Sequence, residues 1–406
     1  MKGLAITATL AFRNLSRNRR RSILTIAAIA FALAALLVFD ALKEGLHQTM
    51  VDTATATDIG ALQVHSHEFR ANLITLSPLP TPEKVSQALG DMGITTFARR
   101  LKTSGLLLAG PKSSAIVLHG VVSAEEARVT TVHQQLVAGR APAAEREVMV
   151  GAGLAQAFGL KVGDQITLMV QDLFGSPVRR QFTVSGLYQT GVAAFDQGHL
   201  FMSLSSLQSL LDAADMVSEI AIALPMASLA APAGELRQRL GVDYQVKTWQ
   251  EIAPDVSQLI ALNETTMAIL VAIVFLIVAL GIVNTMTTIT FERFREFGTI
   301  AALGATPAGI MGLVTAEALA LGLTASCVGS AIGITLCLYL ASHGLDLTAL
   351  TSANQYFSNN HILKAVLDWP QVLYTNAFTL LTAVLAGLYP AWSAARQDPA
   401  QALNHL

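Results

Sequence analysis

Residue types that carry enzyme chemistry occur in this chain, but their spacing matches no reaction centre. His65 and His67 would share one face of a strand, yet no third metal ligand stands near them in the sequence. Cys327 and Cys337 fall inside an apolar run, with a spacing that suits neither a zinc site nor a disulfide within a helix. The P-loop, the HExxH zinc motif and the GxSxG nucleophile elbow are absent from the sequence. We therefore expect a non-enzymatic chain, with no catalytic residue, no metal ligand and no cofactor of its own.

Charged residues gather in one short segment, where they indicate a docking surface. In the 290–309 segment, acidic and basic side chains alternate with an apolar stripe. A short amphipathic helix of mixed charge suits the binding of another protein, and glycines in it permit sharp turns or close backbone approach. The residues expected to contact a partner are Glu292, Arg293, Phe294, Arg295, Glu296, Gly298, Leu303 and Gly304. The alternative is a solvated loop with ordinary salt bridges.

The next apolar run contains an ionisable residue and a pair of glycines. Glu317 lies about two helical turns inside the run, where an ionisable side chain is costly and often functional. A purely structural place near the headgroups is the alternative. Gly329 and Gly333 form a GxxxG step, a spacing that lets two membrane helices approach closely.

Four long apolar runs must position these residues. A bilayer core of about 30 Å needs roughly 20 apolar residues to be crossed as a helix. Only 13% of the 406 residues are charged, against about 25% in a typical soluble protein. We therefore expect a membrane α-helical protein with four transmembrane helices and a large water-soluble α+β domain inserted between the first and second.

The expected segments follow from these runs and from the patterns between them. They are a basic, amphipathic N-terminal segment (1–22), the first membrane helix (23–39), a stalk helix (40–56), the α+β domain (57–247), a second stalk helix (248–264), the second membrane helix (265–289), a cytoplasmic coupling segment (290–309), the third membrane helix (310–341), a periplasmic loop (342–370), the fourth membrane helix (371–392) and a cytoplasmic C-terminus (393–406). Within the domain, strands are expected near 61–65, 114–119, 165–170, 181–184, 199–202 and 219–224, with helices near 151–158, 205–212 and 233–240.

Charge sets the expected orientation. The charged residues that precede the first apolar run are all basic, and cytoplasmic flanks carry such an excess of basic residues. The region between the first two runs carries more acidic than basic residues, which suits the opposite side. Four crossings then return the C-terminus to the cytoplasm. A cleaved signal peptide is the alternative for the first run, but the run is long for one and no convincing cleavage site follows Phe39.

Three motifs in order resemble the FtsX/MacB-type permeases of ABC transporters, also called mechanotransmission permeases. They are the basic entry at 13–25, the turn at 292–307 that ends in Leu-Gly-Ala-Thr-Pro, and the C-terminal stretch at 389–403. The resemblance covers essentially the whole chain. Within the family, the soluble domain is similar to the Lol lipoprotein-releasing permeases (LolC/LolE-like), on the segments 62–65, 159–168 and 182–188.

The resemblance implies a permease subunit in the bacterial inner membrane, with the large α+β domain as a periplasmic domain. Two permease chains would pair as a homodimer or heterodimer, and each would dock a separate ABC ATPase subunit that binds ATP and Mg. The 290–307 segment would be the coupling helix, and stalk helices would carry its motion outward to extract lipoproteins, or a similar amphiphile, from membrane lipid. Charge reversal at Arg293 and Arg295 is then expected to lower ATP turnover without unfolding the chain. Nucleic acid is not an expected partner.

Two alternatives and one departure accompany this resemblance. The chain could be a MacB-like exporter of peptides or small molecules, or an FtsX-like protein that activates a periplasmic cell-wall hydrolase. In the Lol subunit that recruits the periplasmic carrier, a long hook loop projects between two strands. The matching connection here contains Leu173, Phe174, Gly175 and Pro177 and is expected to be shorter, which leaves carrier recruitment by this chain open. For the cargo, the inner faces of the first two membrane helices near Asp40 and Thr266 are a topological guess.

Overall fold

The computed structural model describes residues 19–70, 76–346 and 362–396. The chain divides into two compact units. The membrane unit is built from Met1–His47, Ile260–Leu345 and Leu363–Leu406, and the soluble unit from Gln48–Leu259 and Asp346–Ile362. The expected amphipathic segment at 3–18, most of the expected loop at 342–370 and the end of the C-terminal segment lie outside the described residues.

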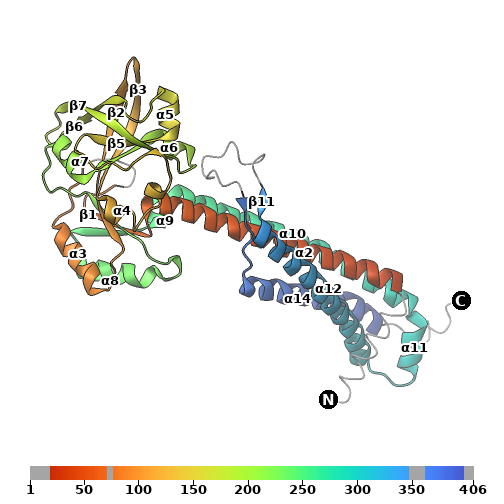
Figure 1. The fold of residues 1–406 in the computed structure, drawn as a ribbon. Helices are drawn as coiled ribbons and strands as arrows, with labels where there is room; N and C mark the ends of the chain where they lie inside the picture. Colours follow the sequence, from red (N-terminus) through yellow and green to blue (C-terminus); the bar gives the residue numbers. More distant parts are fainter. Residues whose placement is uncertain (1–18, 71–75, 347–361, 397–406) are drawn as a thin grey trace. The chain divides into compact units, whose positions relative to one another are not determined.

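Within the described residues, four helices are long and apolar enough to cross a membrane, as the composition predicts (Figure 1). They are α2 (Arg19–Ala54), α10 (Pro254–Glu292), α12 (Pro307–His343) and α14 (Trp369–Ala395). Between α10 and α12 lies the short helix α11 (Phe294–Ala302), and β11 (Leu345–Asp346) pairs with β12 (Ile362–Leu363) between α12 and α14. The apolar helices also pack on one another, since small and branched side chains from all four meet in one buried cluster: Ile29, Ile282, Met286, Ala318, Leu321, Ala325, Ala383 and Ala386.

The two expected stalk segments differ in how they continue into membrane helices. The first is part of the unbroken helix α2, which is followed by a single π-helical turn, η1 (Thr55–Ile59). The second is interrupted, because one residue, Ala253, separates the end of α9 (Trp249–Ile252) from the start of α10 at Pro254. A proline disfavours the helical conformation of the residue before it, and Ala253 leaves the helical region accordingly. The expected continuous stalk at 248–264 is therefore wrong at Ala253.

In the part of the chain that the structure describes, the soluble unit is an α+β domain around one ten-stranded sheet. The strands are β1 (Leu62–Ser66), β2 (Phe97–Ala109), β3 (Lys112–Val121), β4 (Leu136–Gly139), β5 (Glu147–Gly151), β6 (Gln165–Gln171), β7 (Pro177–Tyr188), β8 (His199–Ser203), β9 (Glu219–Ile222) and β10 (Tyr244–Thr248). Their order in the sheet is β10-β1-β9-β2-β3-β8-β5-β7-β4, and β6 pairs with β2 and β7. The β3–β8 and β5–β7 pairs are parallel, whereas the other pairs are antiparallel.

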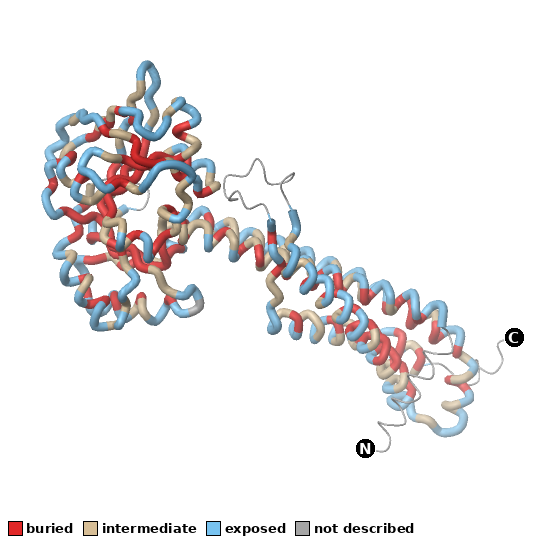
Figure 2. Tube along the Cα trace, in the orientation of Figure 1, coloured by how far each residue is buried: buried red, intermediate tan, exposed pale blue. Residues whose placement is uncertain are grey.

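Short helices complete the soluble unit and cover its core. They are α3 (Pro82–Asp91), α4 (Ser123–Glu126), α5 (Ala152–Phe158), α6 (Ala193–Gly198), α7 (Leu204–Leu211) and α8 (Ala230–Leu240), with the 3₁₀ turns η2 (Val132–Gln134) and η3 (Met226–Ser228). In β6, buried side chains alternate with more exposed ones, the period-2 pattern of a strand with one face on a core. Figure 2 shows the buried residues concentrated along the central strands of this unit.

The strands and helices that the pattern predicts in the domain are found, and four further strands are present that it does not predict. β2 is the longest of these, and its first half carries Arg99, Arg100 and Lys102 rather than an apolar alternation. Arg100 nevertheless faces inward and is 1% exposed, because acidic side chains from other elements neutralise it. A strand whose inward positions are charged gives no hydrophobic signal, so the periodicity could not reveal it.

Candidate functional site

An apolar groove of about 600 Å³ lies between α2 and α10 in the membrane unit. Its walls are almost entirely hydrocarbon and come from these two helices alone: Leu24, Thr25, Ala28, Ile29, Phe31, Ala32, Ala35, Leu36 and Phe39 of α2, and Leu270, Val274, Ile277, Val278, Gly281, Asn284 and Thr285 of α10. At one end, the hydroxyls of Thr25 and Thr285 share a hydrogen bond of 2.9 Å and so satisfy each other. A groove of this size and lining can take an acyl chain or a comparable apolar group. It lies between the two helices of the topological guess, although Asp40 and Thr266 are not among its walls.

The start of α11 is fixed by a buried ion pair. Nη1 of Arg293 donates to both carboxylate oxygens of Glu317 on α12, at 2.6 and 2.9 Å, and Nε of Arg293 donates to Glu296 at 2.9 Å. The guanidinium also lies over the ring of Phe297, 4.9 Å from its centroid. Arg293 and Glu317 are 9% and 3% exposed. The pair therefore joins the 290–309 segment to the third membrane helix.

Other residues of the same segment are exposed. Arg295 and Phe291 face outward, and Leu303, which follows α11, is 84% exposed. Gly304 has φ of +98°, a left-handed conformation that a glycine adopts without strain and that turns the chain toward α12. The exposed arginine and the two exposed apolar side chains are accessible to another protein.

The glycines of the GxxxG step lie against α2. A Cβ placed on Gly329 would come within 2.7 Å of the carbonyl oxygen of Ala30, and one on Gly333 within 3.0 Å of the Leu37 side chain. The absence of a side chain at Gly329 is therefore what allows the two backbones to lie this close. Further along the unit, Gly322 of α12 faces Ala383 of α14 in the same way.

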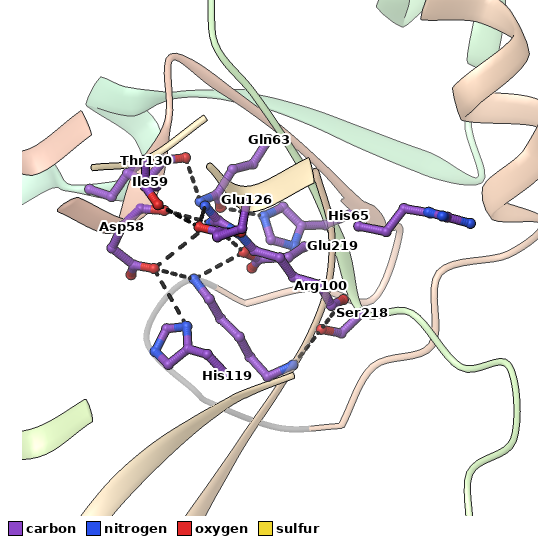
Figure 3. Close-up of polar contacts among 12 residues, drawn as sticks. Asp58, Ile59, Gln63, His65, Arg100, His119, Glu126, Thr130, Ser218 and Glu219 are labelled. Carbon is purple, nitrogen blue, oxygen red and sulfur yellow. Dashed lines mark hydrogen bonds and ion pairs between the residues drawn. The ribbon is translucent and has the colours of Figure 1, made fainter. Parts of the chain in front are cut away.

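A cluster of buried and partly buried charges lies in the soluble unit, where η1 meets the sheet (Figure 3). We call Asp58, Arg100, Lys102, Glu126 and Glu219 the joint cluster. Arg100 makes a two-bond contact with Glu126 at 2.8 and 2.7 Å, and Lys102 lies 2.9 Å from both Asp58 and Glu219. Burial alone would raise the pKa of the Asp58 carboxyl, but the positive charges of Lys102 and Arg100 hold that pKa far below its ordinary value.

Histidines surround the joint cluster without being charged by it. His119 Nε2 and His199 Nδ1 share a hydrogen bond of 2.8 Å, and His65 bonds to Gln63 while stacking on Phe69. Burial lowers the pKa of His199 and of His65 to about 4, and lowers the pKa of His119 well below its usual value. All three are therefore neutral at neutral pH. His67 is exposed, so the histidine pair of the sequence does not act as one site.

The β6–β7 connection is a tight turn. The carboxylate of Asp172 accepts hydrogen bonds from the backbone N–H groups of Phe174 and Ser176, at 2.9 and 2.7 Å, and so holds the turn closed. Leu173 and Phe174 are exposed at the tip, the latter by 78%. Gly175 has φ of +81°, and β7 begins at the next residue but one, Pro177. The connection is thus a hairpin turn rather than a projecting hook.

Two family profiles match the chain. The MacB-like periplasmic core domain matches residues 22–239, more than half of the chain, and the FtsX-like permease C-terminal domain matches residues 268–399. The chain belongs to the FtsX/MacB-type permeases of ABC transporters. It is an inner-membrane permease whose soluble unit is a MacB-like periplasmic core domain.

Curated relatives of the permease carry Lol names. LolC of Xylella fastidiosa (strain Temecula1), named as a transmembrane protein of the lipoprotein-releasing system, is 24% identical over 379 residues, which cover 87% of this chain and 91% of that protein. LolE of Haemophilus influenzae is 24% identical over 327 residues, which cover 77% of each protein. Among solved structures, the periplasmic region of MacB from Actinobacillus actinomycetemcomitans aligns with a TM-score of 0.35 and 14% identity, covering 51% of this chain and 95% of that chain.

The structure separates the predicted site residues of the permease into two groups. Arg293, Glu296 and Glu317 come together in one ion-paired cluster, whereas Arg295 and Leu303 remain exposed. Because Arg293 is buried in this ion pair, we now expect that reversing its charge destabilises the chain, whereas the sequence alone suggested that the chain would stay folded. A reversed charge at this buried position would place three carboxylates together, which lowers the free energy of unfolding.

Sequence reasoning missed the joint cluster and the detailed walls of the groove. Arg100 and Lys102 lie two residues apart on a strand, which places them on the same face, where Arg100 is buried and Lys102 is partly buried. A pair of basic residues at this spacing was the available signal. Their acidic partners come from α4 and β9, far along the chain, so no local pattern could pair them.

Acidification is expected to destabilise the soluble unit of the permease between about pH 6.5 and pH 4. His65 and His199 have folded-state pKa values of about 4, below the value of 6.5 of a free histidine, so the unfolded chain binds more protons in this window. Their contribution to stability is complete above pH 6.5 and is lost as the pH falls toward 4. Thermal unfolding of the purified protein at a series of pH values would measure it. The substitution His65→Gln should flatten the slope and His67→Gln, at an exposed position, should not; an unchanged melting temperature across the window would contradict the assignment.

Proposed function

We propose that this chain is the permease subunit of an ABC transporter that releases lipoproteins, or a similar amphiphile, from the inner membrane. The apolar groove between α2 and α10 carries the proposal, because its hydrocarbon walls suit the acyl chains by which a lipoprotein is anchored. The similarity to LolC and LolE along most of the chain supports the same cargo class. In this proposal both termini are cytoplasmic and the soluble unit is periplasmic.

Two partner chains complete the proposed transporter. A separate ATPase subunit would bind ATP and Mg, and the surface formed by Phe291, Arg295 and Leu303 would receive it. A second permease chain, identical or related, would pair through the membrane helices, for which the exposed apolar side of α10 offers a face. The tight β6–β7 turn favours a role as the subunit that does not recruit the periplasmic carrier.

Export of peptides or small molecules is the second candidate function. The match of residues 22–239 to the MacB-like periplasmic core domain favours it. The two candidates differ in where the cargo travels, since release from the membrane uses the groove between α2 and α10 whereas export of a soluble molecule does not need it.

The groove is tested by filling it. The permease is reconstituted in liposomes with its ATPase and partner chain, and ATP-dependent release of an acylated protein is measured. Ala35 lines the groove, whereas Ala27 is exposed on the same helix outside it. The substitution Ala35→Trp should lower release at least tenfold, about 1.4 kcal/mol in barrier terms, while Ala27→Trp should leave it near the wild-type rate. Equal release by both variants would remove the groove from the function, and export of a soluble cargo by Ala35→Trp at full rate would favour the MacB-like alternative.

Docking of the ATPase is tested at the exposed residues. The double substitution Arg295→Glu and Leu303→Asp is expected to lower ATP turnover of the complex several-fold, because it reverses one exposed charge and removes an exposed apolar anchor. The melting temperature of the isolated chain should stay the same, since neither side chain is buried. Arg70→Glu, an exposed arginine of the soluble unit, is the matched control. Full turnover in the double variant would place the docking surface elsewhere.

A further inference from the structure

The end of α2 is built in an unusual way. The helix passes into the π-helical turn η1, in which the N–H of Gly60 donates to the carbonyl of Thr55 at 2.9 Å, and β1 follows almost at once. Gly60 has φ of +70°, and a Cβ there would come within 3.0 Å of the Ile222 carbonyl oxygen on β9. Single π turns are rare and occur frequently at functional sites. The chain therefore passes from the stalk helix to the sheet without a flexible linker.

Polar contacts hold this turn against the domain (Figure 3). The Asp58 carboxylate lies 2.9 Å from Lys102 Nζ, and the Asp58 carbonyl accepts a hydrogen bond of 2.5 Å from Arg100 Nη1. The N–H of Thr131, after α4, donates to the Ala56 carbonyl at 2.8 Å. Both the side chain and the backbone of the turn are thus bonded to parts of the domain that are distant in sequence.

The basic partners of the turn are themselves immobilised. Arg100 is 1% exposed and is held by Glu126 through two bonds and by Glu219 at 3.1 Å. Glu219 also lies 2.9 Å from Lys102. A buried ionic network is a poor means of gaining stability, because apolar residues of similar volume often serve as well or better. What such a network does supply is a fixed, directional geometry.

From these contacts we infer that Asp58 and Lys102, held in place by Arg100, are positioning residues that fasten the end of the stalk helix to the sheet. Displacement of α2 along or across its axis then moves the domain with it, instead of being lost in a loop. The inference rests on the proposed function, in which ATP binding by the partner subunit moves the stalk helices. It adds the place where that motion enters the soluble unit.

The experiment compares coupling with turnover in the complete transporter. The amount of acylated protein released per ATP hydrolysed is measured for Asp58→Asn and Lys102→Met. All variants carry Cys327→Ser, which removes the exposed native cysteine before further cysteines are introduced. Both variants should retain ATP turnover and lose at least tenfold in released protein per ATP. Lys102→Arg keeps the charge and should retain most of the ratio. Arg140→Met, which breaks the exposed Arg140–Glu147 pair of the same unit, is the matched control and should have no effect.

A disulfide between η1 and the domain tests whether the loss in Asp58→Asn comes from detachment of η1 or from a general folding defect. Ala56 and Thr131 are hydrogen-bonded through their backbones, so a cysteine is placed at each of these two positions, and formation of the disulfide that would pin η1 to the domain is verified after oxidation. In the Asp58→Asn background, the oxidised pair should restore the ratio, and reduction should abolish the rescue. Wild-type ratios in both Asp58→Asn and Lys102→Met, or a verified disulfide that restores nothing, would overturn the inference.

A cargo-independent measurement separates this inference from the proposed function. Spin labels on Phe174→Cys in the soluble unit and on Trp369→Cys in the membrane unit report an ATP-dependent change of distance, and both positions are exposed. A wild-type complex that changes this distance but releases no acylated protein would refute lipoprotein release alone. In that case the inference about the joint cluster is supported if Asp58→Asn abolishes the distance change and is refuted if it does not. A wild-type complex without any distance change would overturn the joint directly.

Discussion

Replacing Arg293 by alanine is expected to lower the stability of the membrane unit by about 3–5 kcal/mol, the usual cost of removing one partner from a buried ion pair. Glu317 would keep its charge at a position that is only 3% exposed, without the two hydrogen bonds that Arg293 donates to it. For a unit of this size the melting temperature should fall by roughly 6–20 °C. The start of α11 would also lose its attachment to α12, so ATP turnover should become independent of cargo.

A charge exchange tests whether the pair itself is responsible. Arg293→Glu alone should be more damaging than Arg293→Ala, because it adds a third carboxylate beside Glu296 and Glu317. Adding Glu317→Arg to it should recover part of the melting temperature, since opposite charges again face each other across the same two helices. Arg295→Ala, two residues away and exposed, is the control and should change the melting temperature little. A wild-type melting temperature in Arg293→Ala would show that the ion pair does not hold α11.

The division between Arg293 and Arg295 shows where sequence reasoning about this segment ends. Composition placed the charged segment between two apolar helices, and the structure has α11 there. The two arginines are indistinguishable in a local pattern. One is buried only because α12 brings Glu317 to it from 24 residues further along the chain. A contact of that kind depends on how two helices pack, which hydrophobic periodicity does not specify.

The membrane helices were predictable for a reason that does not extend to the soluble unit. A bilayer requires a long apolar run wherever a helix crosses it, so each span can be recognised from consecutive residues of the sequence. The sheet of the soluble unit is defined instead by pairing between distant strands, such as β1 with β9 and β10. Strands with an apolar alternation were found, whereas β2 was missed because Arg100 and Lys102 occupy inward positions. Helix α3 was missed although Pro82 stands at its first turn, a start signal that the surrounding prolines obscured.

Packing, rather than residue type, also defines the parts of the molecule that the proposed function needs. The groove is made of residues that any membrane helix could carry, and only the packing of α2 beside α10 makes it a groove. The joint cluster is made of residues that a surface could carry, and only the fold brings them together. In both places the residue types are ordinary and the arrangement is informative. Substitutions that change the arrangement while keeping the chemistry are therefore the most direct tests.

Adding a single methyl group at Gly329 is such a substitution, and it is expected to push α12 away from α2. The Cβ of Gly329→Ala would lie 2.7 Å from the Ala30 carbonyl oxygen and 3.0 Å from its Cα, both backbone atoms that cannot rotate away. Overpacking of this kind costs about 1–3 kcal/mol, which corresponds to a fall of roughly 2–12 °C in melting temperature. Gly333→Ala should cost less, because the nearest atom, at 3.0 Å, belongs to the flexible side chain of Leu37.

Gly312 supplies the matched control on the same helix. Nothing lies within 4 Å of a Cβ built there, and alanine is the better helix former, so Gly312→Ala should leave the melting temperature unchanged or raise it slightly. The expected order of stability is therefore Gly312→Ala, then Gly333→Ala, then Gly329→Ala. Because α2 presents Ala30 to α12 and the adjacent Ile29 to the groove, a shift of α2 should also lower lipoprotein release in Gly329→Ala. If Gly329→Ala melts like Gly312→Ala, the two helices do not pack through the GxxxG step, and the groove beside them loses the support that fixes its width.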